Sequence, residues 1–370
     1  ENAIIDGMLQ VCAKAGITPK EIAQIIHGTT LATNALIERR GAKVATITTE
    51  GFRDILEIAR ERRYSQYAIN IEKPDLIVPR ARAFTIGGRM NAAGEELRPL
   101  DETAIDALAA NLQGVDAVAV CLMHAYANPA HELRLRDLLN ELLPQLVVSL
   151  SHEVSPEARE FDRLCTTVAN AYIQPLMARY LSDFEARFSV EGLTCPILMM
   201  TASGGMTSVA TAARLPIRLV ESGPAGGAIL AARIAEETDE AHVLSFDMGG
   251  TTAKLCLIDD FRPQTARSFE ISRAERFLKG SGMPVRIPVT EMIEIGAGGG
   301  SIASVDSLGR LTVGPQSAGA DPGPAAFGKG GKQATVTDAD IAMGLIEPSR
   351  FAEGRLQIDA SAARSAWEEH

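Results

Sequence analysis

The stretch SFDMGGTTAKLCLIDD, residues 245–260, holds the residue types in this chain that are best suited to phosphate chemistry. Its apolar run is interrupted by one carboxylate, two glycines and two hydroxyls: Asp247, Gly249, Gly250, Thr251 and Thr252. Because glycine accepts positive φ and carries no Cβ, two glycines let the N–H groups of a tight turn converge. Converging N–H groups and hydroxyls can hold phosphate oxygens, and an aspartate can hold Mg²⁺ through water. The alternative interpretation of this stretch is an ordinary hairpin turn.

A second glycine-rich turn lies in IEIGAGGGSIASVDSLGRLTV, which begins at Ile293. A dinucleotide fingerprint needs a helix after its glycines, so that the pyrophosphate can lie at the helix N-terminus. Here the following residues alternate as two strands would, around a turn at Leu308 and Gly309. The pattern argues against a dinucleotide site. It predicts a loop whose backbone can approach a ligand closely, formed by Gly298, Gly299 and Gly300.

Two other motifs are ambiguous. GPAAFGKG, residues 323–330, is close to a P-loop, but Gly330 stands where a P-loop has Ser or Thr and no strand leads into it. We therefore expect an irregular loop there. ESGPAGGA, residues 221–228, begins a helix with small side chains. Such a surface lets a second helix or a neighbouring domain approach closely, and it is also typical of a tightly packed core helix.

Other chemistries find little support. The sequence has no GxSxG nucleophile motif, and its histidines do not show metal-ligand spacing. His27 ends an apolar segment just before Thr29 and Thr30, so these three residues are candidates for substrate contact, with a structural role for His27 as the alternative. Four acidic residues precede a long helical pattern, and we expect them to be solvated and to cap the helix: Glu153, Glu157, Glu160 and Asp162.

The elements that must position these residues alternate between strand and helix. Helical periodicity over residues 1–17 is followed by strand–helix alternation to residue 60 and again over 101–149, and by a long helix over 156–190. This alternation predicts an α/β fold with a parallel sheet and crossover helices. We also expect a hairpin around FTIGGRMNAAGEEL and a buried strand at HVLSF, just before the first glycine turn.

The composition bounds the function classes. A net charge of −11 over 370 residues argues against nucleic acid as the main partner, because a phosphate backbone selects basic surfaces. The sequence has no uncharged apolar run long enough for a membrane span. Five scattered cysteines indicate reduced, buried thiols in a cytoplasmic protein. The chain begins without Met and ends inside a helical pattern, so we expect a piece of a longer protein.

Several of these motifs together resemble the hydantoinase/oxoprolinase A-subunit family. They occur in the same order along nearly the whole chain: HGTTLATNALIERRGAKVATITTEGFRDILEIAR, SHEVSPEAREFDRLCTTVANAYIQP, ESGPAGGA, DMGGTTAK, IEIGAGGGSIASVD, and VGPQSAGADPGPAAFGKGG followed by TVTDAD. Lys254 and the loop LKGSGMPVRIPV point to the hydantoinase-like branch of that family.

The resemblance implies an α/β fold of the actin-like ATPase (ribonuclease H-like) type, with two domains around a nucleotide cleft. Residues 1–236 would form the first domain and residues 237–370 the second. DMGGTT would be the second phosphate loop and would bind ATP, with Asp247 as the catalytic residue that holds Mg²⁺. Gly298–Gly300 would line the same cleft, and ESGPAGGA would lie where the domains hinge.

The family's first phosphate loop does not occur in this sequence, and part of the second domain also has no counterpart. We therefore expect the architecture to be incomplete at both ends, and this chain alone to bind ATP weakly. The expected activity is ATP-dependent hydrolysis of a cyclic amide, a hydantoin or a lactam like 5-oxoproline, through phosphorylation of the amide oxygen and with a B-type partner subunit. The alternatives are an ATP-dependent ketone carboxylase subunit and a non-catalytic, nucleotide-switched binding module.

Overall fold

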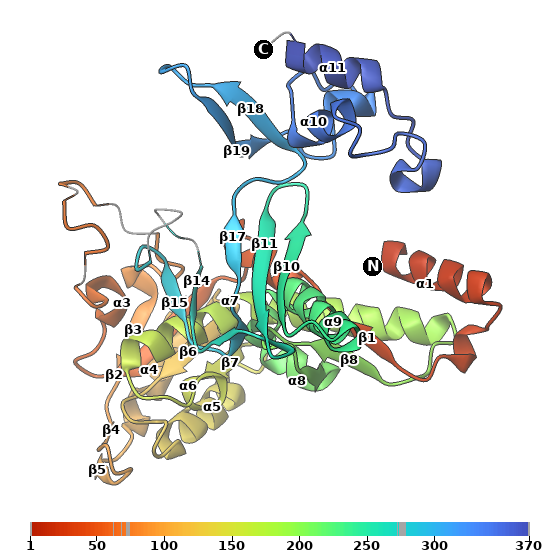
Figure 1. The fold of residues 1–370 in the computed structure, drawn as a ribbon. Coiled ribbons are helices and arrows are strands. Elements are labelled where there is room, and N and C mark those ends of the chain that lie inside the picture. Colours follow the sequence, from red (N-terminus) through yellow and green to blue (C-terminus); the bar gives the residue numbers. More distant parts are fainter. Residues whose placement is uncertain are drawn as a thin grey trace. The chain divides into compact units, whose positions relative to one another are not determined.

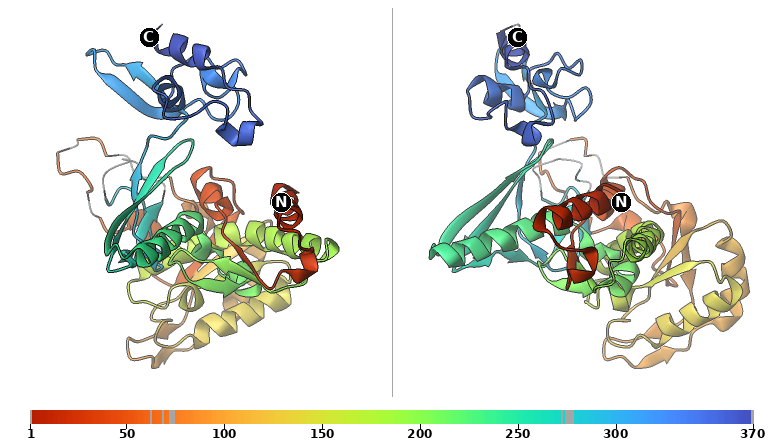
Figure 2. Two further views of the ribbon diagram at one scale, coloured as in Figure 1. Left: turned by 45° about the vertical axis from the view of Figure 1, so that its right-hand side comes forward. Right: turned by 90° about the vertical axis from the view of Figure 1, so that its right-hand side faces the viewer.

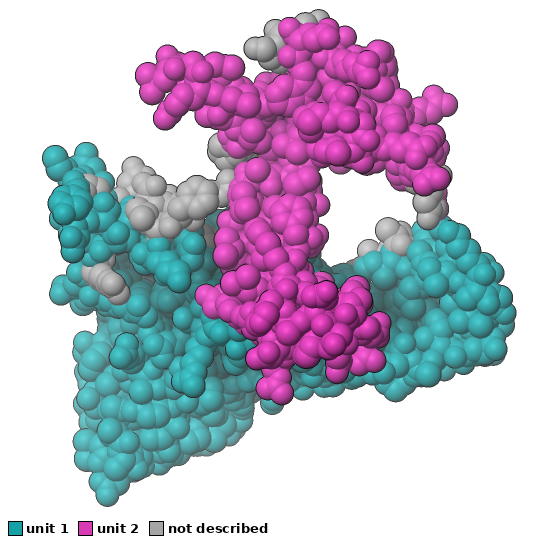
Figure 3. All heavy atoms as spheres, viewed as in Figure 1, with its two compact units in different colours: residues 1–226, 265–290 teal, residues 227–264, 291–370 magenta. Residues whose placement is uncertain are grey.

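The computed structural model describes residues 2–61, 63–67, 69–71, 75–271, 273 and 279–368. The chain divides into two compact units, shown in Figure 3: residues 1–226 with 265–290, and residues 227–264 with 291–370. The boundary near residue 226 lies ten residues before the one expected from the sequence, and a later segment returns to unit 1. That the two units are the domains of an actin-like ATPase stays a prediction.

Unit 1 is built around a parallel four-stranded sheet of order β3-β2-β6-β7, which confirms the α/β expectation. Its strands are β2 (Val44–Thr49), β3 (Ala83–Ile86), β6 (Ala117–Cys121) and β7 (Val147–Leu150). Alternate residues of β6 enter two different cores, because successive side chains of a strand point to opposite faces. One core packs against α7 (Glu160–Val190) and the other against α4 (Ile105–Asn111) and α5 (Ala130–Leu142).

The rest of unit 1 comprises a small sheet and short elements, labelled in Figure 1. The small sheet has the order β1-β8-β9, with β1 (Ile25–His27), β8 (Ile197–Met200) and β9 (Met206–Ser208). The other helices are α1 (Asn2–Ala15), α2 (Leu31–Ile37), α3 (Ile55–Ile58), α6 (Ser151–Val154) and α8 (Val209–Arg214). Two-stranded ladders join β4 (Arg89–Met90) to β5 (Glu96–Arg98), β13 (Thr265–Ala266) to β16 (Val289–Thr290), and β14 (Phe269–Ile271) to β15 (Met283–Val285).

Unit 2 contains a long antiparallel hairpin, visible in Figures 1 and 2, of β10 (His242–Met248) and β11 (Ala253–Asp259). β11 also pairs with β12 (Arg262–Pro263) and β17 (Ile293–Ile295). A second hairpin joins β18 (Ser301–Val305) to β19 (Leu311–Ser317). The helices are α9 (Ser222–Thr238), which begins in unit 1, α10 (Val336–Ala342) and α11 (Ala360–Glu368). Among the described residues, no helix is both long and apolar enough to cross a membrane.

Three expectations need correction. Only β4 and β5 form the hairpin expected around FTIGGRMNAAGEEL, because Phe84 belongs to β3 of the parallel sheet. The strand at HVLSF is not buried, since Leu244 is 53% and Phe246 59% exposed and the described residues do not cover that face. Asp162 is 1% exposed rather than solvated, because it pairs with Arg60 and, at 3.0 Å, with Arg286.

Candidate functional site

The tip of the β10–β11 hairpin carries the first glycine turn. The strands stay in register as far as the pair Met248 and Ala253, and the Gly249 N–H donates to the Thr252 carbonyl at 2.9 Å. Within the described residues, the N–H groups of Gly250, Thr251 and Thr252 donate no hydrogen bond, and the two threonine hydroxyls make none. The tip therefore offers three backbone donors and two hydroxyls to a ligand.

The second glycine loop lies directly against this tip and orients it. The Gly299 N–H donates to the Gly249 carbonyl at 2.9 Å, and the Gly300 N–H donates to the Gly250 carbonyl at 2.7 Å. In a planar trans peptide the N–H points opposite to the C=O. Because both carbonyls point at the second loop, the N–H groups of Gly250 and Thr251 point away from it. Two successive N–H groups on one side form an anion-binding concavity.

The glycines of the second loop are required by this packing. A Cβ on Gly298 would lie 2.6 Å from both the Gly249 carbonyl oxygen and the Thr251 nitrogen. A Cβ on Gly300 would lie 3.0 Å from the Gly250 carbonyl oxygen. Real Cβ atoms essentially never make contacts as short as those at Gly298, and at Gly300 the neighbouring backbone would have to shift by a few tenths of an ångström. The structure thus brings the two predicted loops together, and it gives Gly298–Gly300 a supporting position behind the turn.

Asp338 anchors the other side of this loop, and the sequence analysis did not single it out. Its carboxylate is fully buried and accepts the Thr335 N–H and hydroxyl, at 3.0 and 2.7 Å, in a capping box at the start of α10. It also accepts the N–H groups of Ala325 and Ala326. The N–H of the residue before Asp338, Thr337, donates to the Gly299 carbonyl at 2.8 Å. The signal in the sequence was the Thr-x-x-Asp spacing in TVTDAD.

The hydrogen bonds of Asp338 also show whether the GPAAFGKG segment can bind phosphate as a P-loop does. It forms a single 3₁₀ turn over Ala325–Phe327 inside an irregular loop, as expected. The Ala325 and Ala326 N–H groups, which a P-loop would direct at phosphate, are taken up by Asp338. This segment is therefore not a phosphate loop.

Asp247 lies two residues before the tip, in a cross-strand row with Lys254 and Glu294. Residues directly opposite each other share one face of a sheet, so this face is charged. The opposite face carries exposed apolar side chains: Leu244, Phe246, Met248, Leu257, Ile293 and Ile295. Among the described residues, no three His, Cys, Asp or Glu side chains form a metal cluster. Asp247 is an exposed carboxylate two residues before the phosphate donors, and such a group fits Mg²⁺, which keeps most of its waters and takes phosphate oxygens as ligands.

The substrate candidates belong to unit 1. His27 Nε2 lies 2.9 Å from the Tyr180 hydroxyl, and its ring stacks on Phe184 with the centroids 4.7 Å apart. Burial lowers the pKa of His27. These contacts are those of a structural histidine, the alternative that the sequence left open. Thr29 is held by Ser222, whose hydroxyl donates to the Thr29 carbonyl at 3.1 Å, while the Thr30 side chain is exposed.

The small residues of ESGPAGGA have a packing role in unit 1. A Cβ on Gly28 would lie 3.6 Å from the Gly223 Cα, and one on Gly226 would lie 3.8 Å from Met200. The first turn of α9 therefore packs closely against the turn after β1 and against β8. A role for this helix as a hinge stays a prediction.

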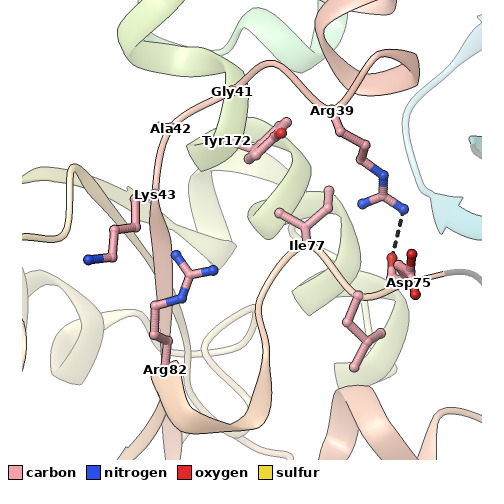
Figure 4. A pocket seen from close by; sticks show the side chains of 9 residues that line it. Arg39, Gly41, Ala42, Lys43, Asp75, Ile77, Arg82 and Tyr172 are labelled. Atoms are coloured by element: carbon pink, nitrogen blue, oxygen red, sulfur yellow. Dashed lines mark hydrogen bonds between the residues drawn. The ribbon is translucent and has the colours of Figure 1, made fainter.

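A pocket of about 400 Å³ lies beside the amino ends of β2 and β3 in the parallel sheet of unit 1 (Figure 4). Its charged lining residues are Arg39, Lys43, Asp75 and Arg82. Arg39 reaches across to the Asp75 carbonyl at 2.6 Å. Ligands of parallel sheets bind at the carboxyl ends of the strands, so we do not assign the active site to this pocket.

Comparison with known proteins places the chain in a family. Residues 163–370 match the model described as hydantoinase/oxoprolinase, and residues 1–143 match that of the hydantoinase/oxoprolinase N-terminal region. The chain belongs to the hydantoinase/oxoprolinase family. This confirms the family predicted from the motifs.

Three relatives of this family member are informative. Caprolactamase subunit alpha of Pseudomonas jessenii is 36% identical over 372 residues, covering 98% of this chain and 52% of its own length. Acetophenone carboxylase gamma subunit of Aromatoleum aromaticum is 30% identical, covering 95% and 50%. 5-Oxoprolinase 1 of Arabidopsis thaliana is 31% identical, covering 95% and 29%. The chain thus spans about half the length, or less, of these relatives.

The fold is also found in a solved relative. The crystal structure of the ATP-dependent caprolactamase from Pseudomonas jessenii superposes with a TM-score of 0.80 at 36% identity, covering 98% of this chain and 52% of that one. The mixed α/β architecture is therefore that of the hydantoinase/oxoprolinase family.

Proposed function

We propose that this chain is the nucleotide-binding part of an A-type subunit that opens a cyclic amide at the expense of ATP, within an actin-like two-domain architecture. The observation that carries the proposal is the hairpin tip, where the second glycine loop holds the N–H groups of Gly250 and Thr251 outward. Relatives named caprolactamase and 5-oxoprolinase, both of which act on lactams, support the substrate class.

The chemistry explains why ATP is needed. A lactam or hydantoin carbonyl is a poor electrophile, and phosphorylation of its oxygen makes the carbon reactive. The amide oxygen attacks the γ-phosphorus and ADP leaves. Water then adds to the carbon, and the C–N bond breaks as nitrogen takes a proton, which leaves an acyl phosphate. A second water attacks the acyl carbon and breaks its C–O bond, so that phosphate leaves with the original amide oxygen. Such transfer depends on positioning and on charge neutralisation more than on a protein nucleophile.

The residues of the tip suit these demands. The backbone N–H groups and hydroxyls of Thr251 and Thr252 would hold phosphate oxygens, and Asp247 would hold the waters of a metal ion. Mg²⁺, when bound, would neutralise phosphate charge. A B-type subunit is the expected partner, since the caprolactamase and acetophenone carboxylase relatives are themselves named as subunits.

A ketone carboxylase is the second candidate, favoured by the acetophenone carboxylase relative at 30% identity. It would use the same phosphorylation chemistry on a different carbonyl. An assay of the assembled protein for bicarbonate-dependent ATP turnover with ketones separates the two functions.

The proposal is tested by ATP turnover with a panel of lactams and hydantoins in the whole protein and its partner subunit. We expect stimulation by a cyclic amide and its loss, by about 100-fold or more, in Asp247→Asn, the range seen when a charge-stabilising group is removed from an active site. Asp260→Asn is the matched control, because Asp260 is exposed in the turn after β11 and its positive φ suits asparagine. An Asp247→Asn protein with the full stimulated rate would contradict the assignment.

A further inference from the structure

The parallel sheet of unit 1 has a topological switch point that the sequence analysis did not use. From β2 the chain continues to β3 on one side, whereas β6 and then β7 follow on the other. In such sheets ligands bind beyond the carboxyl ends of the strands, at the point where the strand order reverses. Here that point lies between β2 and β6, where the Thr49 hydroxyl accepts the Met123 N–H at 2.9 Å.

A buried carboxylate joins the carboxyl ends of β6 and β7, next to this switch point. Glu132 is fully buried and accepts four hydrogen bonds, from the Leu122 N–H at 2.9 Å, the Ser151 hydroxyl at 2.6 Å, and the His152 N–H and Nδ1 at 3.1 and 2.7 Å. An ionised carboxylate has about four acceptor positions, so all are used. Since the carboxylate only accepts, His152 must carry its proton on Nδ1, and Nε2 is left with a lone pair when the ring is neutral.

The second nitrogen of His152 is available. The imidazole is 15% exposed whereas the Glu132 side chain is 0% exposed, and Nε2 makes no hydrogen bond with any described residue. A buried carboxylate that holds one ring nitrogen of a partly exposed histidine is the arrangement that orients a catalytic imidazole in acyl-transfer enzymes.

The other histidine–carboxylate pairs in the described chain differ from this one. In the His131–Glu96 pair the imidazole is 8% exposed and the carboxylate 50%, so the carboxylate is the exposed partner. In the His242–Asp259 pair both side chains are more than half exposed. The pair at the sheet edge is therefore not simply a common surface contact.

A buried arginine extends the network to a second histidine. Arg163 is fully buried, donates to the Ser151 hydroxyl at 3.0 Å and to the Leu122 carbonyl at 2.9 Å, and lies 5.2 Å from the centre of the Tyr126 ring. The Tyr126 hydroxyl lies 3.1 Å from His124 Nδ1. His124 has a φ of +57°, an uncommon conformation for a residue other than glycine, and such residues gather at functional sites.

Cys121 is the one thiol close to this network, and it is not the reactive group. Burial raises the pKa of Cys121 to about 11, so the thiol stays protonated at neutral pH. Proton transfer at this edge would therefore fall to an imidazole.

We propose that His152 Nε2 is a proton acceptor for the ring-opening step and that Glu132 is its positioning residue. For its substrate this inference rests on the proposed function. As water forms its O–C bond with the phosphorylated amide carbon, one water proton passes to Nε2 and the C=N π pair moves to nitrogen. The imidazolium then returns that proton to the departing amine as the C–N bond breaks. The added hydroxyl forms the C=O bond of the acyl phosphate and releases its own proton to solvent.

The decisive experiment measures ADP and ring-opened product separately in the assembled protein. We expect His152→Gln and Glu132→Gln to lower product formation by about 100-fold or more, the usual contribution of a general base. In both variants ADP release stimulated by the lactam should fall far less. Imidazole in the medium should restore product to His152→Ala, which a purely structural role would not permit. His242→Gln, at the exposed pair, is the control and should behave as the wild type.

Two outcomes would overturn the inference: full product formation by His152→Gln, or failure of imidazole to rescue a folded His152→Ala protein. A wild-type protein without lactam-stimulated ADP release would instead refute the proposed function. Because variants at a buried network can unfold, the ¹⁵N NMR spectrum of the wild-type imidazole gives an independent test. The inference requires the proton of neutral His152 on Nδ1, and a proton on Nε2 would contradict it.

Discussion

Gly298 illustrates how a single missing side chain shapes the candidate phosphate site. With no Cβ at this position, the second glycine loop can lie against the Gly249 carbonyl and the Thr251 nitrogen. The conformation of the hairpin tip therefore depends on Gly298, which packs against the tip on the side away from the proposed ligand.

We predict that Gly298→Ala destabilises unit 2 by about 1–3 kcal/mol, the cost of forcing extra volume into a packed site. Chemical denaturation with fluorescence or circular dichroism detection measures it. Gly227→Ala is the matched control, because Gly227 lies inside α9 with nothing within 4 Å of its Cβ position. It should gain up to about 1 kcal/mol from helix propensity. Equal effects of the two changes would show that the loop packing is not as described.

Residue types and spacing were enough to predict the loop of Asp247 to Thr252, because its members are adjacent in sequence. The Glu132 network could not be predicted in the same way. His152 lies 20 residues from Glu132, and Arg163 donates to a carbonyl 41 residues away at Leu122. Only the fold of the parallel sheet brings these groups together, and the sequence analysis singled out none of the three.

Among the secondary-structure elements, α10 contacts two of the loops near the site. Its capping box holds Asp338, which joins the start of the helix to the 3₁₀ turn at Ala325 and Ala326. A hydrogen bond from the Thr337 N–H to the Gly299 carbonyl joins the helix to the glycine loop. A short helix thus fixes two loops that contain little regular structure of their own.

We predict that Asp338→Asn destabilises unit 2 by about 2 kcal/mol, because the amide nitrogen cannot accept the buried N–H groups that the carboxylate accepts. Thermal or urea unfolding measures the loss. Asp340→Asn, on the same helix and without a recorded side-chain hydrogen bond among the described residues, should change stability by less than about 0.5 kcal/mol. Unchanged stability in Asp338→Asn would mean that the cap does not anchor the loops.

The pattern of the sequence predicted the elements of the parallel sheet well, since the buried strand β6 is a continuous apolar run and β2 is rich in β-branched residues. It predicted correctly that β10 is a strand, but the prediction that this strand is buried was wrong. Whether the apolar face of a strand is covered depends on what packs against it, and local sequence does not contain that information. The hairpin expected near residue 90 was too long for the same reason, because Phe84 pairs with a strand far away in sequence.

At the scale of the whole molecule, the two units are interleaved along the chain. Residues 265–290 leave unit 2 and return to unit 1, where Arg286 pairs with Asp162 and with Glu157. A single boundary at residue 236 was expected from the sequence, and that residues 1–236 and 237–370 are the two domains stays a prediction. The family was recognisable because motif order survives such insertions.

In the proposed reaction, ATP phosphorylates the amide oxygen itself. This step is tested most directly with a lactam labelled with ¹⁸O at its carbonyl, incubated with ATP and the whole protein with its partner subunit. If the oxygen attacks the γ-phosphorus and water later attacks carbon, the label must appear in inorganic phosphate, as mass spectrometry would detect. Ring opening with unlabelled phosphate, and all the ¹⁸O retained in the carboxylate product, would contradict the account.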